Sequence, residues 1–198
     1  MSFFDGAGFA YLPHPDCARH DLGLWHPESP KRLAAVGVMH ALAEYRLRRT
    51  AIVDFDVHHG NGTEDIFRSE PRVLLCSSFR HPFYPHSGAN SAHAGSIPAP
   101  LPEGADGGQI RAAVEQKFLP ALEAFRPELI FISAGFDAHR DDPLGGLRLV
   151  EDDYAWITHE ICAIADRHAS GRVVSAPEGG YDLAALGRGA VAHVKALN

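Results

Sequence analysis

Short apolar runs alternate with stretches of helical periodicity along the 198-residue chain. The runs are rich in valine, isoleucine and phenylalanine, which favour strands, whereas apolar residues three or four positions apart favour helices. Strands that alternate with helices are typical of an α/β domain built on a parallel sheet. The pattern predicts strands over 8–12, 51–56, 72–77, 129–134 and 172–176, and helices over 30–46, 108–125, 151–168 and 182–196.

Two long segments lack either period; the first is rich in histidine, proline and aspartate, and the second holds proline, glycine and histidine. They cover residues 13–30 and 80–107, and both are predicted to be loops. Loops of this length inside compact domains tend to be functional. A short helix is expected to open at Thr63-Glu64-Asp65, because acidic residues favour the first turn of a helix. The length predicts one domain over residues 1–198.

Metal-binding residue types gather where the second predicted strand ends. Residues 54–62 read D-F-D-V-H-H-G-N-G. Because side chains alternate along extended backbone, Asp54, Asp56 and His58 are expected to project to one side. Carboxylate oxygen and imidazole nitrogen two positions apart are a natural pair of ligands for a divalent metal such as zinc.

Two more strand ends carry polar or flexible residues. The apolar run over 129–134 leads to Asp137, in the place of a third metal ligand, and the last predicted strand leads to Gly179, Gly180 and Tyr181. In parallel α/β sheets, sites form at the carboxyl ends of the strands. The glycine pair and the tyrosine are therefore candidates for the surroundings of the same site.

Together, these motifs and the sequence H-P-E-S-P-K-R-L over 26–33 resemble the zinc-dependent histone deacetylase and acetylpolyamine amidohydrolase family, closest to its bacterial, class II-like branch. The resemblance implies an arginase-like open parallel sheet with flanking helices. It implies Asp56, His58 and Asp137 as Zn²⁺ ligands, and Tyr181 as the group that polarises the acyl carbonyl and stabilises the oxyanion. The implied substrate is acetyl-lysine in a protein or an acetylpolyamine.

The resemblance also assigns supporting roles around these ligands. It implies that Asp54 and Ser78 hold a structural K⁺ ion together with backbone carbonyls. It implies that Asp54 and Asn61 orient a pair of catalytic histidines. For His59 two interpretations stay open: a hydrogen bond that supports the metal ligands, or packing beneath the loop.

The sequence departs from the family pattern at the catalytic histidines. Family members carry a His-His pair upstream of the metal strand as general base and acid, but no such pair precedes Asp54 here. We therefore expect an internal deletion with a join near 32–35, which removed on the order of a hundred residues and about two strands. Catalytic competence is then in doubt, and a zinc- and acyl-ligand-binding pseudoenzyme without turnover is the alternative.

A second alternative comes from the D-A-H-R-D sequence over 137–141, which also resembles the metal motif of the ureohydrolases. In that interpretation His139 and Asp141 are ligands, and the protein is a binuclear manganese enzyme. The number and identity of the bound metal ions distinguish the two families.

Composition limits the partners. The net charge of −7 argues against direct nucleic-acid binding, and no apolar run of 18 residues predicts a membrane span. Cys17, Cys76 and Cys162 lie far apart and are expected to be free thiols, with Cys76 in the core. Free thiols and the absence of a signal-like start favour the cytoplasm. His168 and His193 are expected on helix surfaces.

Overall fold

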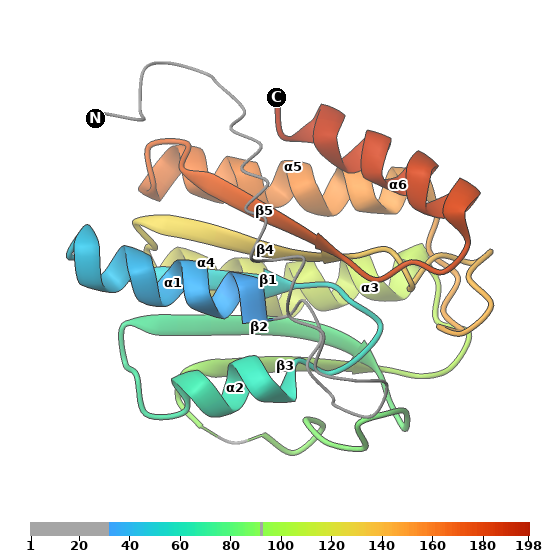
Figure 1. The fold of residues 1–198 in the computed structure, drawn as a ribbon, viewed down its shortest axis with the longest axis horizontal. Coiled ribbons are helices and arrows are strands. Elements are labelled where there is room, and N and C mark those ends of the chain that lie inside the picture. The colour runs from blue at the N-terminus through green and yellow to red at the C-terminus, as the bar shows by residue number, and fades with distance from the viewer. Residues whose placement is uncertain (1–31, 92) are drawn as a thin grey trace, which may run out of the picture.

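A five-stranded parallel sheet forms the centre of the protein in the computed structural model, which describes residues 32–91 and 93–198 (Figure 1). The prediction of an open parallel sheet with flanking helices is confirmed. The strand predicted over 8–12 and the loop over 13–30 lie outside the described residues. The strand order is β3-β2-β1-β4-β5, with bounds β1 Thr50–Asp54, β2 Val73–Arg80, β3 Ser96–Leu101, β4 Leu129–Gly135 and β5 Val173–Glu178.

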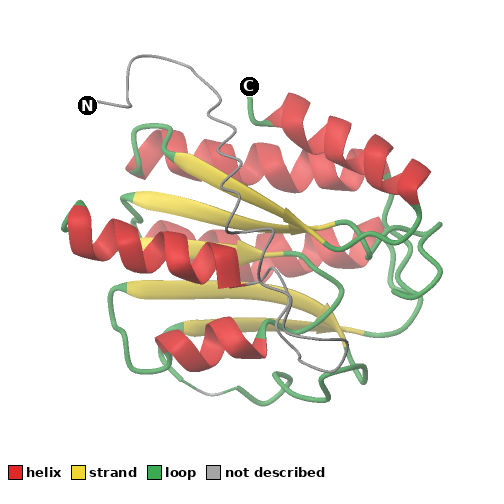
Figure 2. Ribbon diagram, in the orientation of Figure 1, coloured by secondary structure: helices red, strands yellow, loops and turns green. Residues whose placement is uncertain are grey.

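Helices cover both faces of this sheet (Figure 2). One face carries α1 Arg32–Glu44 and α2 Asn61–Phe67, whose apolar residues form the smaller of two core clusters. The other face carries the remaining helices and the larger cluster, which includes Cys76 as predicted. These helices are α3 Gly107–Ala113, α4 Leu119–Phe125, α5 Glu151–His168 and α6 Leu183–Ala196.

The helix predicted over 108–125 is interrupted by a wide turn. The segment η1, Val114–Phe118, has π-helical geometry between α3 and α4. Pro120 lies in the first turn of α4, and its ring removes one backbone donor from the regular helical ladder. The side chain of Asp106 caps the start of α3 by accepting the backbone N–H groups of Gly108 and Gln109.

The prediction of an unstructured loop over 80–107 is wrong in part, because this segment contains β3. Its sequence, Ser-Ile-Pro-Ala-Pro-Leu, has two prolines, which argue against a central strand. The strand pairs only with β2 and lies at the edge of the described sheet, where one side of the strand needs no donors. Proline is tolerated in an edge strand. The position of β3 in the sheet therefore explains why it forms a strand despite its two prolines.

The central position of β1 aligns the polar ends of the neighbouring strands. Asp54 is opposite Ser77 of β2 and Ser133 of β4 in the strand register. All five residues of β1 are buried, as expected for a parallel strand covered on both faces. The segments that follow β1, β4 and β5 therefore all begin at the carboxyl end of the sheet.

The two edge strands of the described sheet are β3 and β5. Strand β5 is more exposed than the central strand β1. The side chain of Val174 is 44% exposed, and Val36 of α1 is 62% exposed. An open edge with apolar side chains is a template for association with another chain. Among the described helices, none is long and apolar enough to cross a membrane.

Candidate metal centre

Asp56, His58 and Asp137 meet at the carboxyl end of the sheet. Each offers one potential ligand atom, and these atoms all lie within 4.8 Å of one another. The His58 Nδ1 atom is 3.1 Å from Asp56 Oδ1 and 3.2 Å from Asp137 Oδ2. Two buried carboxylates and one half-buried imidazole are a donor set suited to a divalent cation. The structure thus brings together the three residues that the motifs marked as ligands.

Backbone hydrogen bonds fix the orientation of these carboxylates. Asp54 Oδ1 accepts the N–H of Asp56 at 3.0 Å, and Asp56 Oδ1 accepts the N–H of His58 at 2.7 Å. Asp137 Oδ1 accepts the N–H of Val57 at 3.0 Å, which ties the segment after β4 to the segment after β1. Each of these bonds satisfies one carboxylate oxygen and directs the side chain.

Glycines allow the three loops to approach one another. A Cβ atom on Gly135 would lie 2.6 Å from Asp56 Oδ2, and one on Gly179 would lie 2.8 Å from Asp137 Oδ2. Gly179 also has a φ of +46°, a left-handed conformation that glycine adopts without steric cost. The first glycine of the Gly-Gly-Tyr motif, Gly179, therefore lies directly against the candidate ligands.

The electrostatics of the cluster favour a positive charge between the carboxylates. Burial lowers the pKa of His58, but hydrogen bonds and charges from Asp137 and Asp56 outweigh it and raise the value to about 9. Burial, together with the charge of Asp56, raises the pKa of Asp137 despite its bond to His58. Asp137 Oδ2 is buried, and its ion-pair partner among the described residues is the His58 ring nitrogen at 3.2 Å. A bound cation would satisfy this oxygen, so the residues fit a metal ion.

Tyr181 follows the two glycines, and its backbone is held near the cluster. Its N–H donates to Asp142 Oδ2 at 2.8 Å. Its side chain is 55% exposed, and Gly180 before it has a φ of +108°. A side chain on such a loop has room to turn toward the metal ligands, and its contact with a substrate carbonyl stays a prediction.

Asp54 and Ser78, the predicted potassium ligands, lie close together and are buried. The Ser78 hydroxyl is 3.5 Å from the backbone carbonyl of Asp54. Asn61 is exposed at the start of α2, where its N–H donates to the His59 carbonyl. The potassium ion and the orienting role of Asn61 stay predictions.

His59 is directed away from the three candidate ligands. It is buried, with its ring 4.7 Å from that of Phe79, and Nδ1 is 3.1 Å from Ser87 Oγ. Its Nε2 lies 3.4 Å from a carboxylate oxygen of Glu64 on α2. These contacts favour the packing interpretation, in which His59 joins the loop to α2.

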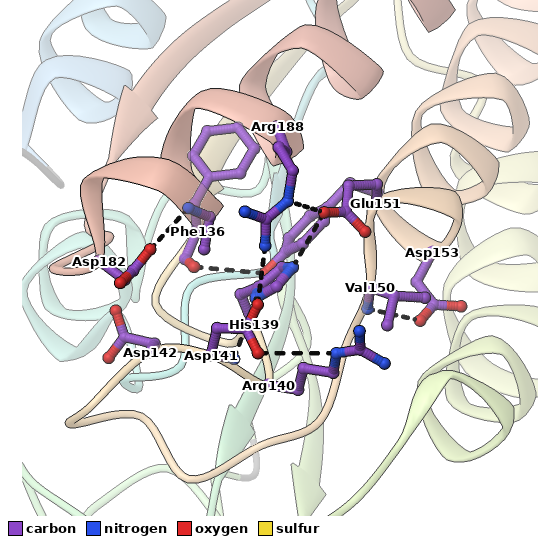
Figure 3. A network of polar contacts seen from close by, with 12 residues as sticks. Phe136, His139, Arg140, Asp141, Asp142, Val150, Glu151, Asp153, Asp182 and Arg188 are labelled. Carbon is purple, nitrogen blue, oxygen red and sulfur yellow. Dashed lines mark hydrogen bonds and ion pairs between the residues drawn. The ribbon is translucent and has the colours of Figure 1, made fainter.

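His139 and Asp141 do not join the candidate metal group. Figure 3 shows both in a network with Arg188 and Glu151. His139 Nδ1 accepts the N–H of Asp141 at 3.0 Å, its Nε2 is 3.5 Å from Glu151, and Arg188 donates to Asp141 at 2.7 Å. The His139 ring also stacks on Tyr154. The geometry therefore does not favour the two-metal, ureohydrolase-like interpretation.

The structure adds residues that the sequence did not single out. Phe83 stacks on the His58 ring with centroids 5.2 Å apart, and Tyr84 meets the same ring edge-on at 6.3 Å. Arg80 lies 4.3 Å from the centre of the Phe83 ring and donates to the Gly145 carbonyl. In the sequence, the signal for these aromatic contacts was that Phe83 and Tyr84 lie between two prolines, shortly after a predicted strand and inside the predicted loop over 80–107.

Comparison with known proteins agrees with this geometry. A family model for the histone deacetylase domain matches residues 33–197. The chain belongs to the histone deacetylase family. It is 38% identical over 154 residues to a histone deacetylase-like amidohydrolase from Pseudomonas aeruginosa, covering 74% of this chain and 40% of that protein. It is 34% identical over 169 residues to the chloroplastic histone deacetylase 14 of Arabidopsis thaliana, covering 82% and 40%.

Solved structures of the histone deacetylase family have the same fold. The crystal structure of the HDA15 HD domain superposes with a TM-score of 0.76 at 36% identity, covering 83% of this chain and 48% of that one. The histone deacetylase Clr3 superposes with a TM-score of 0.70 at 30% identity, covering 80% and 28%. The chain thus spans about half, or less, of the length of these relatives. The family match begins at residue 33, inside the segment predicted for the join, and the deletion itself stays a prediction.

Proposed function

We propose that this chain holds one Zn²⁺ ion through Asp56, His58 and Asp137, and that the site hydrolyses N-acetyl amides. The observation that carries the proposal is the group of two buried carboxylates and one half-buried imidazole at the carboxyl end of the sheet. Three protein ligands leave one coordination position open, which a catalytic zinc site requires. Bound zinc would supply a Lewis acid and lower the pKa of a water molecule.

The residues around the site have separate tasks in this proposal. The hydroxyl of Tyr181 donates a hydrogen bond to the oxyanion that develops on the acyl carbonyl. Gly179 lets the tyrosine loop lie against the ligands, and Gly180 lets it turn with a positive φ. The Phe83 ring covers one side of His58 and reduces access of water there.

The proposed substrates are acetylated amines, either acetyl-lysine in proteins or acetylpolyamines. The names of relatives support this class, since they include an amidohydrolase and several histone deacetylases. The net charge of −7 favours cationic substrates over nucleic acid.

We expect turnover to be slow, because no His-His pair precedes Asp54. A positioned general base or acid contributes about 10²–10⁴-fold to such reactions. His86 lies in the loop after β2, but its side chain is exposed and no contact joins it to the ligands among the described residues. The same observation supports a second candidate function, a zinc- and acyl-ligand-binding protein without turnover.

The test is acetate release from an acetyl-lysine peptide and from an acetylpolyamine by the purified, zinc-loaded chain. Tyr181→Phe removes the oxyanion donor and is expected to lower any turnover by about 10²–10³-fold. Zinc content should be unchanged in that variant. Zinc binding without turnover would favour the second candidate, and turnover that Tyr181→Phe leaves unchanged would contradict the proposed role of the tyrosine.

A further inference from the structure

Asp142 connects the two loops that the proposed reaction needs. It lies in the segment after β4, five residues beyond Asp137, and is only 9% exposed. Its Oδ2 atom accepts the N–H of Tyr181 at 2.8 Å, across 39 positions of sequence. One carboxylate therefore joins the loop of a candidate zinc ligand to the loop of the candidate oxyanion donor.

The other oxygen of Asp142 shapes its own loop. Asp142 Oδ1 accepts the N–H of Leu144 at 2.8 Å and that of Gly145 at 3.0 Å. The N–H of Asp142 itself donates to the His139 carbonyl at 2.9 Å. A carboxylate that accepts three backbone donors in a buried place is a strong and directional anchor.

The turn built in this way lies against the backbone of Asp137. A Cβ atom on Gly145 would fall 1.7 Å from the Asp137 carbonyl oxygen, so only a glycine permits this approach. The position of the 142–145 turn and the position of the candidate ligand are therefore fixed together. Because Asp142 also holds Tyr181, the tyrosine backbone is placed relative to the ligand and not only to β5.

The loop that carries Tyr181 begins with two glycines. Gly179 and Gly180 both have positive φ angles and no side chains, and α6 begins only at Leu183. Glycines lose the most conformational freedom when they are ordered. A hydrogen bond to the backbone of Tyr181 restrains the loop directly after this pair, at the residue whose side chain the reaction uses.

We propose that Asp142 is a positioning residue, which fixes the backbone of Tyr181 beside the metal ligands and acts on the reaction only through that tyrosine. This inference rests on the proposed function for its catalytic consequence, but not for the anchoring itself. The Asp142 carboxylate accepts from the backbone of Leu144, Gly145 and Tyr181, whereas its link to the His139 segment is through its own backbone N–H. Figure 3 shows the Asp142 side chain beside the network of His139 and Arg188.

The decisive variant is Asp142→Asn, which keeps the shape and converts one acceptor oxygen into a donor group. Amide hydrogen exchange of the whole chain, read at the Tyr181 N–H, is expected to be about 10- to 100-fold faster than in wild type. Amides in α5 should exchange at the wild-type rate. Unchanged exchange at Tyr181 would overturn the proposal.

Asp141→Asn is the matched control, because it changes the adjacent carboxylate, which pairs with Arg188 and not with Tyr181. It is expected to leave exchange at the Tyr181 N–H unchanged. Equal acceleration in both variants would mean general loosening of the loop, and would overturn a specific anchor. If Asp142→Asn does not fold, the wild-type chain decides: an unprotected Tyr181 amide in the folded protein overturns the proposal.

Kinetics separate this inference from the proposed function. In a chain that turns over, Asp142→Asn should lower kcat about 10-fold or more at unchanged zinc content. It should have little further effect in a Tyr181→Phe background. An equal loss in both backgrounds would show that Asp142 does not act through Tyr181. If no form turns over, the proposed function fails, whereas the exchange experiment still decides the anchoring.

Discussion

Two histidines in different regions of the protein show how neighbours decide the state of one residue type. His58 lies among carboxylates at the carboxyl end of the central strands, and His193 lies among hydroxyl groups between α6, α5 and β5. Burial lowers the pKa of both. In His58 two carboxylates outweigh burial and raise the pKa to about 9, whereas in His193 burial lowers it to about 4.

The hydrogen bonds of His193 define a structural role. Thr158 donates its hydroxyl proton to the Tyr154 carbonyl at 2.6 Å, so its oxygen accepts from His193 Nδ1–H at 2.7 Å. Nε2 is then an acceptor for the Ser175 hydroxyl at 2.8 Å. The prediction that His193 lies on a helix surface is wrong, because its ring is buried and satisfied on both nitrogens. His168, in contrast, is partly exposed and bonded to Glu123.

This comparison predicts that the two regions respond to different perturbations. The His58 region should respond to metal, because two carboxylates and one imidazole converge there. The His193 region should respond to pH and to loss of a hydroxyl, because its ring is held neutral.

The largest expected effect is on zinc binding. Asp137→Ala should lower zinc affinity by more than about 100-fold, because it removes a direct ligand, and even supporting residues around a metal cost 10–100-fold. His193→Ala should leave one zinc per chain. Zinc content by elemental analysis, with chelator competition for the affinity, checks both. Unchanged zinc in Asp137→Ala, or two manganese ions per wild-type chain, would contradict the assignment.

A smaller effect is expected from pH. The unfolded chain binds a proton at His193 near pH 6.5, but the folded chain binds it only near pH 4. The contribution of neutral His193 is therefore complete above pH 6.5 and is lost as the pH falls toward 4. It amounts to on the order of 3 kcal/mol of unfolding free energy.

Urea unfolding at pH 7 and at pH 4.5 measures this contribution in wild type and in His193→Gln. The wild-type chain should lose more stability than the variant over that interval. Val191→Ala, at an exposed and non-titratable position of the same helix, is the control and should retain the wild-type pH slope. Equal slopes in wild type and His193→Gln would refute the prediction.

Loss of one hydroxyl partner should cost less than the full pH effect. Thr158→Val keeps the shape but leaves the His193 Nδ1–H without its acceptor, in a place with no exposed surface. We expect a loss of about 1–3 kcal/mol at pH 7. Ser175→Ala, on the part-exposed edge strand, should cost less, because water can replace the lost partner there. Chemical unfolding of the two variants gives the comparison directly.

The smallest expected effect concerns the edge strand that carries Ser175. We expect the chain to associate with itself through β5, because this edge of the described sheet is open and Val174 is exposed. Val174→Lys should weaken association, as seen by size-exclusion chromatography and dye binding. Val194→Lys, at an exposed position of α6, should not. A monodisperse wild-type monomer with a sharp thermal transition would be inconsistent with this expectation.

The sequence by itself determined the fold class and the three candidate ligands. Residues 54–58 carry ligand types at every second position where a predicted strand ends, and the carboxyl ends of parallel strands lie together, so Asp137 could be placed beside Asp56 and His58 from local pattern alone. The spacing of ligand types is a short-range property, and short-range properties are readable from the chain.

Tertiary structure alone decided the rest. β3 was missed because its prolines contradict a strand unless the strand lies at an edge, and edge position is a property of the whole sheet. His193 was wrongly predicted to be exposed, although it follows Ala185 and Gly189 on the buried stripe of α6. A polar residue is expected at the surface unless it has buried partners, and the partners of His193 on α5 and β5 cannot be identified from the sequence. The bond from Tyr181 to Asp142 spans 39 positions, and no local pattern encodes such a contact. Packing brings these groups together, and their burial determines how much each contact contributes to the stability of the folded chain.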